Sequence, residues 1–276
     1  GDLGHTFLFE AGGISALGGV FPHTLKNQPD GSLLVEDIEA AIRPDDIHDP
    51  ISRMVILENT HNRCGGTVLG LEYTRSVAKL AHEHNLHLHL DGARLFNAAT
   101  ALGIPAKEVA AAADSVTFCL SKGLCAPVGS VVCGTRDFIR QGIRTRKMLG
   151  GGMRQAGILA AAGIVALEKM TGRLDEDHQK AKKLAAGLAE IPGIEFEMGF
   201  PQTNMVFPFI TKTVPISPEQ VVKKMGELGI RVGIVGPRRF RLVTHYWISM
   251  EDVDTVIEAF VKVLSMDTVN QAPIQP

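Results

Sequence analysis

The sequence is poor in aromatic residues, has no long apolar run and carries no excess of charge of one sign. Aromatic residues make up 5% of the 276 residues, and the formal net charge is −2. Proteins that bind nucleic acid are usually basic and offer aromatic platforms for the bases, so the composition argues against that class. No apolar run approaches the roughly 20 residues of a membrane helix, which argues against a membrane protein.

Cysteine is also scarce, with four residues and no pair at a metal-like spacing. Cys119 and Cys133 stand in apolar, strand-like runs, so we expect them to be buried, reduced thiols. The N-terminus lacks the basic and then apolar pattern of a secretion signal. With 45% hydrophobic residues the chain can build a substantial core, and we expect a soluble protein of the cytoplasm.

Two short apolar runs, at residues 86–90 and 115–120, organise the first half of the chain. Asp91 follows the first run directly, and Lys122 follows the second. The segment between them is alanine-rich and of helical pattern, which is typical of a connection between parallel strands. Because ligands of open α/β sheets bind beyond the carboxyl ends of the strands, we expect Asp91 and Lys122 to meet at one site.

Strands and helices alternate up to residue 171, and the pattern then changes. The alternation predicts an α/β domain with a mainly parallel sheet over residues 1–171. The shorter, mixed elements that follow predict a smaller α+β domain over 172–268 and a tail over 269–276. In the first domain we expect further helices at 5–17, 34–42, 71–84, 136–149 and 155–170, and further strands at 54–57 and 128–133. In the second we expect helices at 174–190, 218–228 and 249–264, and strands at 194–196, 205–209, 231–235 and 240–243.

A lysine and an aspartate at the ends of adjacent strands suit one cofactor. Burial can keep a lysine amine neutral, and a neutral amine attacks an aldehyde. Pyridoxal 5'-phosphate needs a lysine for its aldehyde and a carboxylate that keeps its pyridinium nitrogen protonated. Taken singly, Lys122 is typical of a surface lysine and Asp91 of a helix cap. Together they predict a pyridoxal-phosphate enzyme.

Six motifs stand in one order along nearly the whole chain: HTFLFEAGG at 5–13, ENTHN at 58–62, LDGAR at 90–94, LSKGL at 120–124, GGGMRQ at 150–155 and RLVTH at 241–245. Together they resemble the low-specificity threonine aldolases. The resemblance implies the aspartate-aminotransferase-like fold (fold type I of pyridoxal-phosphate enzymes), with a large cofactor domain and a small C-terminal domain. It also implies a lyase that cleaves β-hydroxy amino acids, L-threonine and L-allo-threonine, to glycine and acetaldehyde, in threonine catabolism and glycine biosynthesis.

The resemblance assigns roles to the residues of the cofactor site. Lys122 would bind the aldehyde of the cofactor, and Asp91 would bind its ring nitrogen. His5 would stack on the ring, and His61 would lie near the substrate hydroxyl. We take His61 as the first candidate for the base that removes the hydroxyl proton and His5 as the second, with a bound water able to assist either. Without the resemblance, His5 would be interpreted as a histidine that faces water at a helix start.

Three arginines complete the roles that the resemblance implies. Arg94 and Arg241 would bind the substrate carboxylate, with Arg94 also counted in the cofactor site, because a planar guanidinium suits bidentate binding. Arg154 would reach the cofactor phosphate of a neighbouring subunit, so we expect a homo-oligomer, a dimer or a tetramer. By itself, Arg94 or Arg241 is more typical of a surface salt bridge, and Arg154 is as typical of a helix cap or an interface.

The chain departs from the family pattern before His5. The family carries there a Ser/Gly/Thr turn and a helix that bind the cofactor phosphate, and we expect this segment to be missing. A transit peptide would be lost with it, so the mitochondrion is the alternative to the cytoplasm. Two other functions stay open: a β-eliminating lyase on the same fold, and a truncated subunit with little or no activity.

A metal site is not expected. His82, His84, His87 and His89 crowd one stretch, but the first two fall at a helix end and the other two alternate on a strand. This spacing gives no compact set of ligands for a transition metal.

Overall fold

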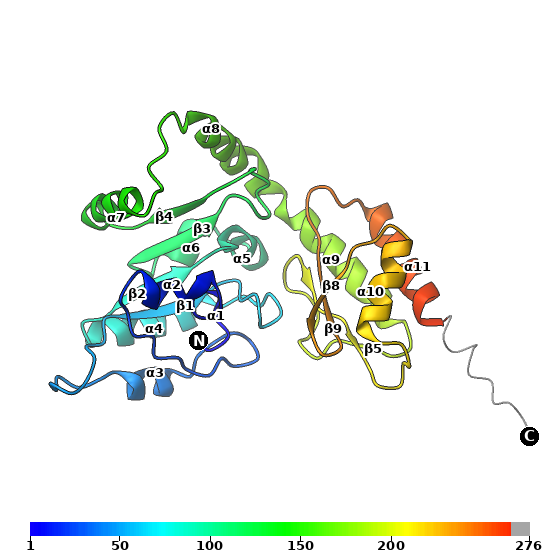
Figure 1. The fold of residues 1–276 in the computed structure, drawn as a ribbon, viewed down its shortest axis with the longest axis horizontal. Helices are drawn as coiled ribbons and strands as arrows, with labels where there is room; N and C mark the ends of the chain where they lie inside the picture. The colour runs from blue at the N-terminus through cyan, green and yellow to red at the C-terminus, as the bar shows by residue number, and fades with distance from the viewer. Residues whose placement is uncertain (266–276) are drawn as a thin grey trace, which may run out of the picture. The chain divides into compact units, whose positions relative to one another are not determined.

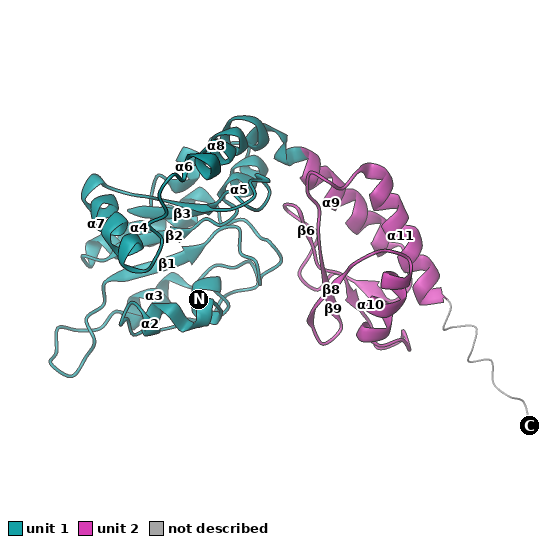
Figure 2. Ribbon diagram, turned by 45° about the horizontal axis from the view of Figure 1, so that its top comes forward, with its two compact units in different colours: residues 1–175 teal, residues 176–276 magenta. Residues whose placement is uncertain are grey.

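A computed structural model describes residues 1–265 of the chain. The chain divides into two compact units, Gly1–Asp175 and Glu176–Pro276 (Figure 2). The division falls inside one helix, α9 (Leu174–Ala189). Within the described residues, no helix combines the length and the apolar character that crossing a membrane requires.

In unit 1, all of whose residues are described, the sheet order is β1-β2-β3-β4: β1 (Met54–Glu58), β2 (His87–Asp91), β3 (Ser115–Cys119) and β4 (Ser130–Cys133). β1, β2 and β3 run parallel, and β4 runs antiparallel to β3. Helices α5 (Leu95–Leu102) and α6 (Ala106–Ala110) join β2 to β3, which confirms the predicted crossover (Figure 1). The carboxyl ends of the three parallel strands therefore meet at one edge of the sheet.

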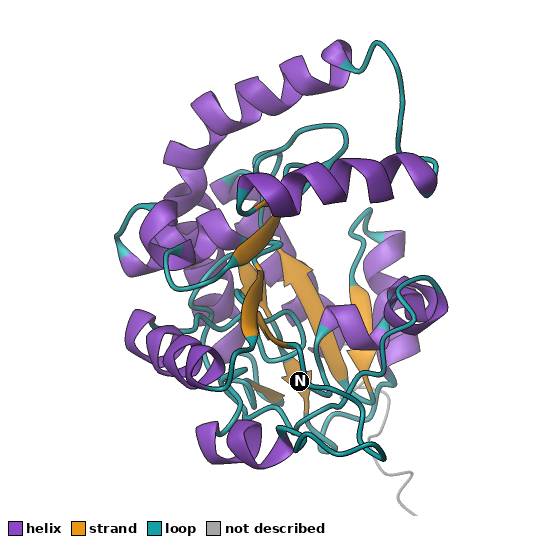
Figure 3. Ribbon diagram, turned by 90° about the vertical axis from the view of Figure 1, so that its left-hand side faces the viewer, coloured by secondary structure: helices purple, strands orange, loops and turns teal. Residues whose placement is uncertain are grey.

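Helices flank the strands of this sheet (Figure 3) and close its core. α3 (Val35–Ala41) packs beside α4 (Leu71–Glu83), and α4 packs on β2. Val77 of α4 and Leu88 and Leu90 of β2 are fully buried in one cluster. Each such side chain contributes about 1.5–3 kcal/mol relative to leaving it exposed. This packing holds β2, and with it the position of Asp91.

The predicted helix over residues 5–17 is wrong as one continuous element. The structure has three short pieces there, α1 (His5–Leu8), η1 (Glu10–Gly12) and α2 (Gly13–Ala16). Glu10, Ala11 and Gly12 all have positive φ, near 55°, 53° and 65°, and left-handed residues cannot continue a right-handed helix. No residue of the three pieces is buried, and Phe7, Leu8 and Phe9 remain 40–42% exposed, so the apolar spacing does not form the buried face of a helix.

The end of unit 1 is helical, as predicted, but its strand is more exposed than expected. α7 (Arg136–Met148) and α8 (Gly157–Val165) follow β4, and two further helical turns, η2 (Ala166–Met170) and η3 (Thr171–Arg173), lead into α9. The predicted burial of Cys133 is wrong, because β4 lies at the edge of the sheet and is mostly exposed. Cys119 is half-buried, and both are free thiols.

Unit 2 is built on short antiparallel strands. β9 (Arg239–Val243) pairs with β6 (Met205–Val206), β7 (Phe209–Ile210) and β8 (Gly233–Gly236), and β7 pairs with β5 (Ile194–Glu195). The predicted strand over 205–209 is thus two strands, because Pro208 between them has no N–H for a ladder. The predicted tail over 269–276 lies outside the described residues.

Helices cover the sheet of unit 2. α10 (Pro218–Glu227) begins with the predicted cap, since Ser217 Oγ accepts the Gln220 N–H at 3.3 Å and the Gln220 side chain accepts the Ser217 N–H at 2.9 Å. α11 (Met250–Ser265) buries Phe260 edge-on against Phe240 of β9, with ring centroids 6.3 Å apart. Unit 2 therefore has its own apolar core.

Candidate active site at the carboxyl ends of the parallel strands

Two carboxylates end neighbouring strands of unit 1. Glu58 is the last residue of β1 and Asp91 the last residue of β2, and the two are directly opposite each other in the parallel register. Each residue is 8% exposed. The Asp91 carboxylate accepts a hydrogen bond from the Ala93 N–H at 3.2 Å. The site therefore contains a second buried acid, Glu58, which the sequence did not mark as a site residue.

Burial raises the pKa of Asp91 above its ordinary value of 3.8, and the negative charge of Glu58 raises it further. The Ala93 N–H, Lys122 and His5 act in the opposite direction, because each favours the carboxylate. The structure thus brings Asp91, Lys122 and His5 within electrostatic reach of one another. A carboxyl group with raised proton affinity makes a strong hydrogen bond to a protonated ring nitrogen.

Lys122 lies beyond the end of β3, in a turn that the Cys125 N–H closes on the Lys122 carbonyl at 2.9 Å. The expectation that burial desolvates this lysine is wrong, because the side chain is exposed. The physical reason lies in the next residue. Gly123 is buried so tightly that a Cβ there would come within 3.0 Å of Leu174 and 3.2 Å of Asn97, so the turn packs inward at Gly123 and leaves Lys122 free to reach a ligand.

His5 is held at the same edge of the sheet by its backbone. It is the first residue of α1, and its N–H donates to Glu58 Oε2 at 2.7 Å. Its ring packs against Phe9, with centroids 4.9 Å apart, and its Nδ1 lies 3.4 Å from Glu10 Oε1. The side chain is 38% exposed, so the imidazole is accessible to a bound ligand.

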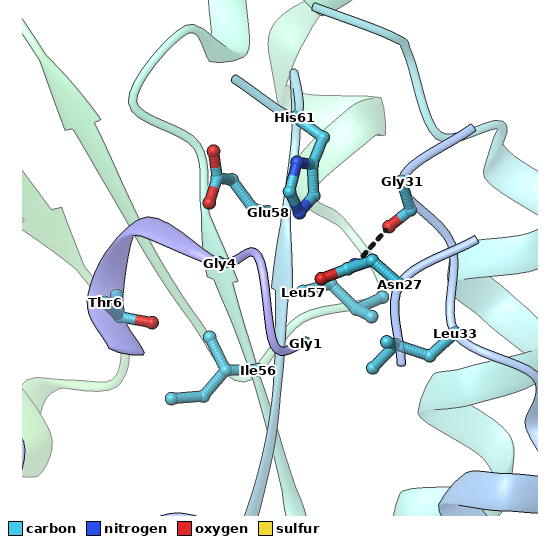
Figure 4. A pocket seen from close by; sticks show the side chains of 10 residues that line it. All are labelled: Gly1, Gly4, Thr6, Asn27, Gly31, Leu33, Ile56, Leu57, Glu58 and His61. Atoms are coloured by element: carbon cyan, nitrogen blue, oxygen red, sulfur yellow. Dashed lines mark hydrogen bonds between the residues drawn. The ribbon is translucent and has the colours of Figure 1, made fainter. Parts of the chain in front are cut away.

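His61 occupies a different environment from the one expected of a residue near the substrate hydroxyl. It is 1% exposed and sits beside Glu58 at the end of β1, against the loop of Asn27 and Gly31 (Figure 4). His61 and Glu58 line a cavity of about 10 Å³, together with Gly4 and other residues. Burial lowers the pKa of His61, which keeps the ring neutral, and Nδ1 has no hydrogen-bond partner among the described residues.

The three arginines occupy three different places. Arg94 is half-buried at the start of α5, three residues after Asp91. Arg154 is exposed before α8. Arg241 lies on β9 of unit 2, opposite Gly233 of β8. Of the three, Arg94 lies on the loop that follows Asp91 at the edge of the sheet where the parallel strands end.

The residues at this edge fit pyridoxal phosphate. A buried carboxylate with raised proton affinity suits the ring nitrogen, and an accessible lysine follows the neighbouring parallel strand. Gly92 lets the chain pass close behind the site, because a Cβ there would come within 2.9 Å of the Thr117 carbonyl oxygen. An accessible histidine at the same edge can lie on a ring face. Glu58 could have been found in the sequence by its position, since it ends β1 as Asp91 ends β2.

The family profile described as beta-eliminating lyase matches residues 1–213. The chain belongs to this family. It is 44% identical over 265 residues to the probable low-specificity L-threonine aldolase 2 of Arabidopsis thaliana, covering 95% of this chain and 75% of that protein. It is 43% identical over 256 residues to the low specificity L-threonine aldolase of Escherichia coli K12, covering 93% and 74%. Both likenesses confirm the resemblance drawn from the six motifs.

Solved structures of threonine aldolases share the fold. A putative L-allo-threonine aldolase of Listeria monocytogenes superposes with a TM-score of 0.78 at 23% identity, covering 95% of this chain and 74% of that chain. The Leishmania major threonine aldolase gives 0.78 at 22% identity, covering 95% and 76%. The predicted fold type I is confirmed, and the family to which this chain belongs is one of pyridoxal-phosphate-dependent lyases.

The raised pKa of Asp91 predicts an unusual pH dependence of the cofactor-free protein. The folded state binds the Asp91 proton more tightly than the unfolded state. This residue therefore lowers the free energy of unfolding as pH rises from its ordinary pKa of 3.8 through the raised folded pKa. Asp91→Asn should remove this loss. Urea titrations of the cofactor-free protein from pH 4 to 8 would measure this. The free energy of unfolding of the variant should rise relative to that of the parent chain towards pH 8.

Asp114→Asn is the matched control, with the opposite sign. Burial opposes ionisation of Asp114, but the Leu88 N–H at 2.7 Å and His82 outweigh it and hold the pKa below 3.8. Asp114 therefore stabilises the fold above its unfolded pKa, and its replacement should lower the free energy of unfolding at neutral pH. An Asp91→Asn protein that is less stable than the parent chain at pH 8 would contradict the raised pKa of Asp91 in the folded protein.

Proposed function

We propose that this protein is a pyridoxal-phosphate-dependent lyase that cleaves L-threonine and L-allo-threonine to glycine and acetaldehyde. The observation that carries the proposal is the placement of Asp91 and Lys122 at the ends of neighbouring parallel strands, in a chain 43% identical to a bacterial low specificity L-threonine aldolase. When bound, the cofactor supplies a protonated ring that accepts the electron pair left at Cα when the Cα–Cβ bond breaks.

The chain's own residues hold the cofactor and the substrate. The Lys122 amine would bind the cofactor aldehyde. Asp91 would bind the ring nitrogen and keep it protonated. Arg94 would bind the substrate carboxylate, for which its planar guanidinium group is suited, and Arg154 would bind the phosphate at a neighbouring subunit.

A base must take the proton of the β-hydroxyl while the Cα–Cβ bond breaks. We propose His5 for this role ahead of His61, the reverse of the order expected from the sequence. His5 is 38% exposed at the edge that carries Asp91, whereas His61 is 1% exposed. A base acts only within hydrogen-bond reach of the proton it removes, and an exposed ring can come within that reach of a bound substrate where a fully buried ring cannot.

Lys122→Ala should abolish both cofactor attachment and cleavage. The purified parent protein, incubated with pyridoxal phosphate, should be yellow, and borohydride should bleach it and fix the cofactor on Lys122. With L-threonine or L-allo-threonine it should release acetaldehyde. Lys79→Ala, on the exposed face of α4, is the control and should leave both properties unchanged.

The same assay separates the alternatives. Release of ammonia and a keto acid in place of acetaldehyde would identify a β-eliminating lyase. A colourless protein without activity would identify a subunit that does not bind the cofactor. Either result would overturn the proposed aldol cleavage.

His5→Ala should lower kcat by about 10²–10⁴-fold, the range typical of a positioned base, with a smaller change in KM. His61→Ala should act mainly on stability, because it empties a buried position that packs on Gly31. Steady-state kinetics and thermal denaturation of both variants make the comparison. A normal kcat for His5→Ala, together with a lost kcat in a folded His61→Ala protein, would restore His61 as the base.

We also propose that the protein forms a homo-oligomer, a dimer or a tetramer. Large apolar side chains are exposed along the segment from α7 to α8, and contiguous exposed apolar surface marks interaction sites. The exposed members are Phe138, Ile143, Met148, Leu149, Met153, Ile158, Ile164 and Val165. Light scattering of the purified holoenzyme should give at least twice the 29.7 kDa chain mass. An active species at 29.7 kDa would contradict the proposal.

A further inference from the structure

Glu58 joins two separate segments of the chain at the active-site edge. Its Oε2 accepts the His5 N–H at 2.7 Å, and its Oε1 accepts the Asn62 N–H at 2.8 Å. Each carboxylate oxygen thus holds one backbone donor, and bonds of this kind to a charged acceptor are about twice as strong as neutral ones. The Glu58 carboxylate fixes the start of α1 to the end of β1.

The chain just before α1 is held by the Asp2 N–H, which donates to the Leu25 carbonyl at 2.7 Å, and by the Leu3 N–H, which donates to Asn27 Oδ1 at 2.9 Å. The Glu58 carboxylate adds a bond to α1 itself, at His5. The helix has four residues, none of them buried, and its N-cap Gly4 provides no side-chain hydrogen bond. A helix of this length is not stable on its own, since nucleation is unfavourable and the gain per residue is small. The Glu58 carboxylate therefore does for α1 what a side-chain cap does for a longer helix.

We propose that Glu58 is a positioning residue of the active site, which acts through His5 by holding the first turn of α1 so that the imidazole faces the Asp91 edge. This inference rests on the function proposed above. Glu58 lies opposite Asp91 in the strand register, so the contact also sets the distance between α1 and the carboxylate that binds the cofactor ring. Glu58 itself touches neither substrate nor cofactor in this role.

Glu58→Gln tests the contact with little change in shape. The amide oxygen can accept one N–H, but the amide nitrogen cannot accept the other, so one of the two backbone donors loses its partner. In the cofactor-free protein, hydrogen exchange of the His5 amide should be faster in Glu58→Gln by at least tenfold. Glu36→Gln, at an exposed glutamate of α3, is the matched control and should leave the exchange unchanged.

In the holoenzyme, Glu58→Gln should lower kcat about 10–100-fold, less than the roughly 10²–10⁴-fold that a positioned base supplies, with KM changed less. The decisive readout is the pair with His5→Ala. Because Glu58 acts through His5, adding Glu58→Gln to His5→Ala should cost no further activity, whereas independent residues would give additive losses. Visible absorbance at saturating pyridoxal phosphate should show full cofactor loading in all variants.

Glu58→Asp serves if the glutamine variant does not fold. It keeps the charge beside Asp91 but is one methylene shorter, so hydrogen exchange of the His5 amide should again be faster. It should also lower kcat in the parent enzyme, but cause no further loss when added to His5→Ala. Unchanged exchange at His5, or an additive loss on His5→Ala, would overturn the role of Glu58. A parent enzyme that does not cleave threonine would instead refute the proposed function, and the exchange measurement would still decide whether Glu58 positions His5.

Discussion

The parallel pairing of β1 with β2 is the constraint on which the site depends, because it sets two carboxylates beside each other at a buried edge. Glu58 and Asp91 are register partners, and each is 8% exposed. In this poorly solvated position the negative charge of Glu58 disfavours ionisation of Asp91, so the arrangement costs stability in the absence of a ligand. Hydrophobic packing of Leu88 and Leu90 holds the strands in this register despite that cost.

Such unfavourable placement of charge is characteristic of functional sites, where a protein gives up stability for activity. A protonated ring nitrogen placed on Asp91 would supply the positive charge that the two carboxylates lack. The backbone N–H groups of His5 and Asn62 already satisfy the Glu58 oxygens, which leaves Asp91 as the acid available to a ligand. The two carboxylates therefore have different roles, although both end parallel strands and are equally buried.

Much of this could be predicted from the sequence, because it depends on local patterns. Apolar runs that end in Asp91 and near Lys122, with a helical segment between them, were enough to place both residues at one edge of a parallel sheet. The failures concern packing at longer range. Residues 5–17 have helical spacing but bury no side chain, Cys133 lies on an edge strand, and the tight burial of Gly123 leaves Lys122 exposed.

The two histidines show why a motif cannot assign a catalytic role by itself. Both belong to motifs typical of the family, and His61 was expected to be the base because the resemblance places it near the substrate hydroxyl. In the structure that loop folds back, with the His61 N–H bonded to the Thr67 carbonyl at 3.0 Å and Gly31, at φ 84°, passing directly over the His61 side chain. His5 remains accessible because a carboxylate from another strand holds its backbone and leaves its ring free. Access and anchoring, which only the folded chain determines, make His5 the stronger candidate for the base.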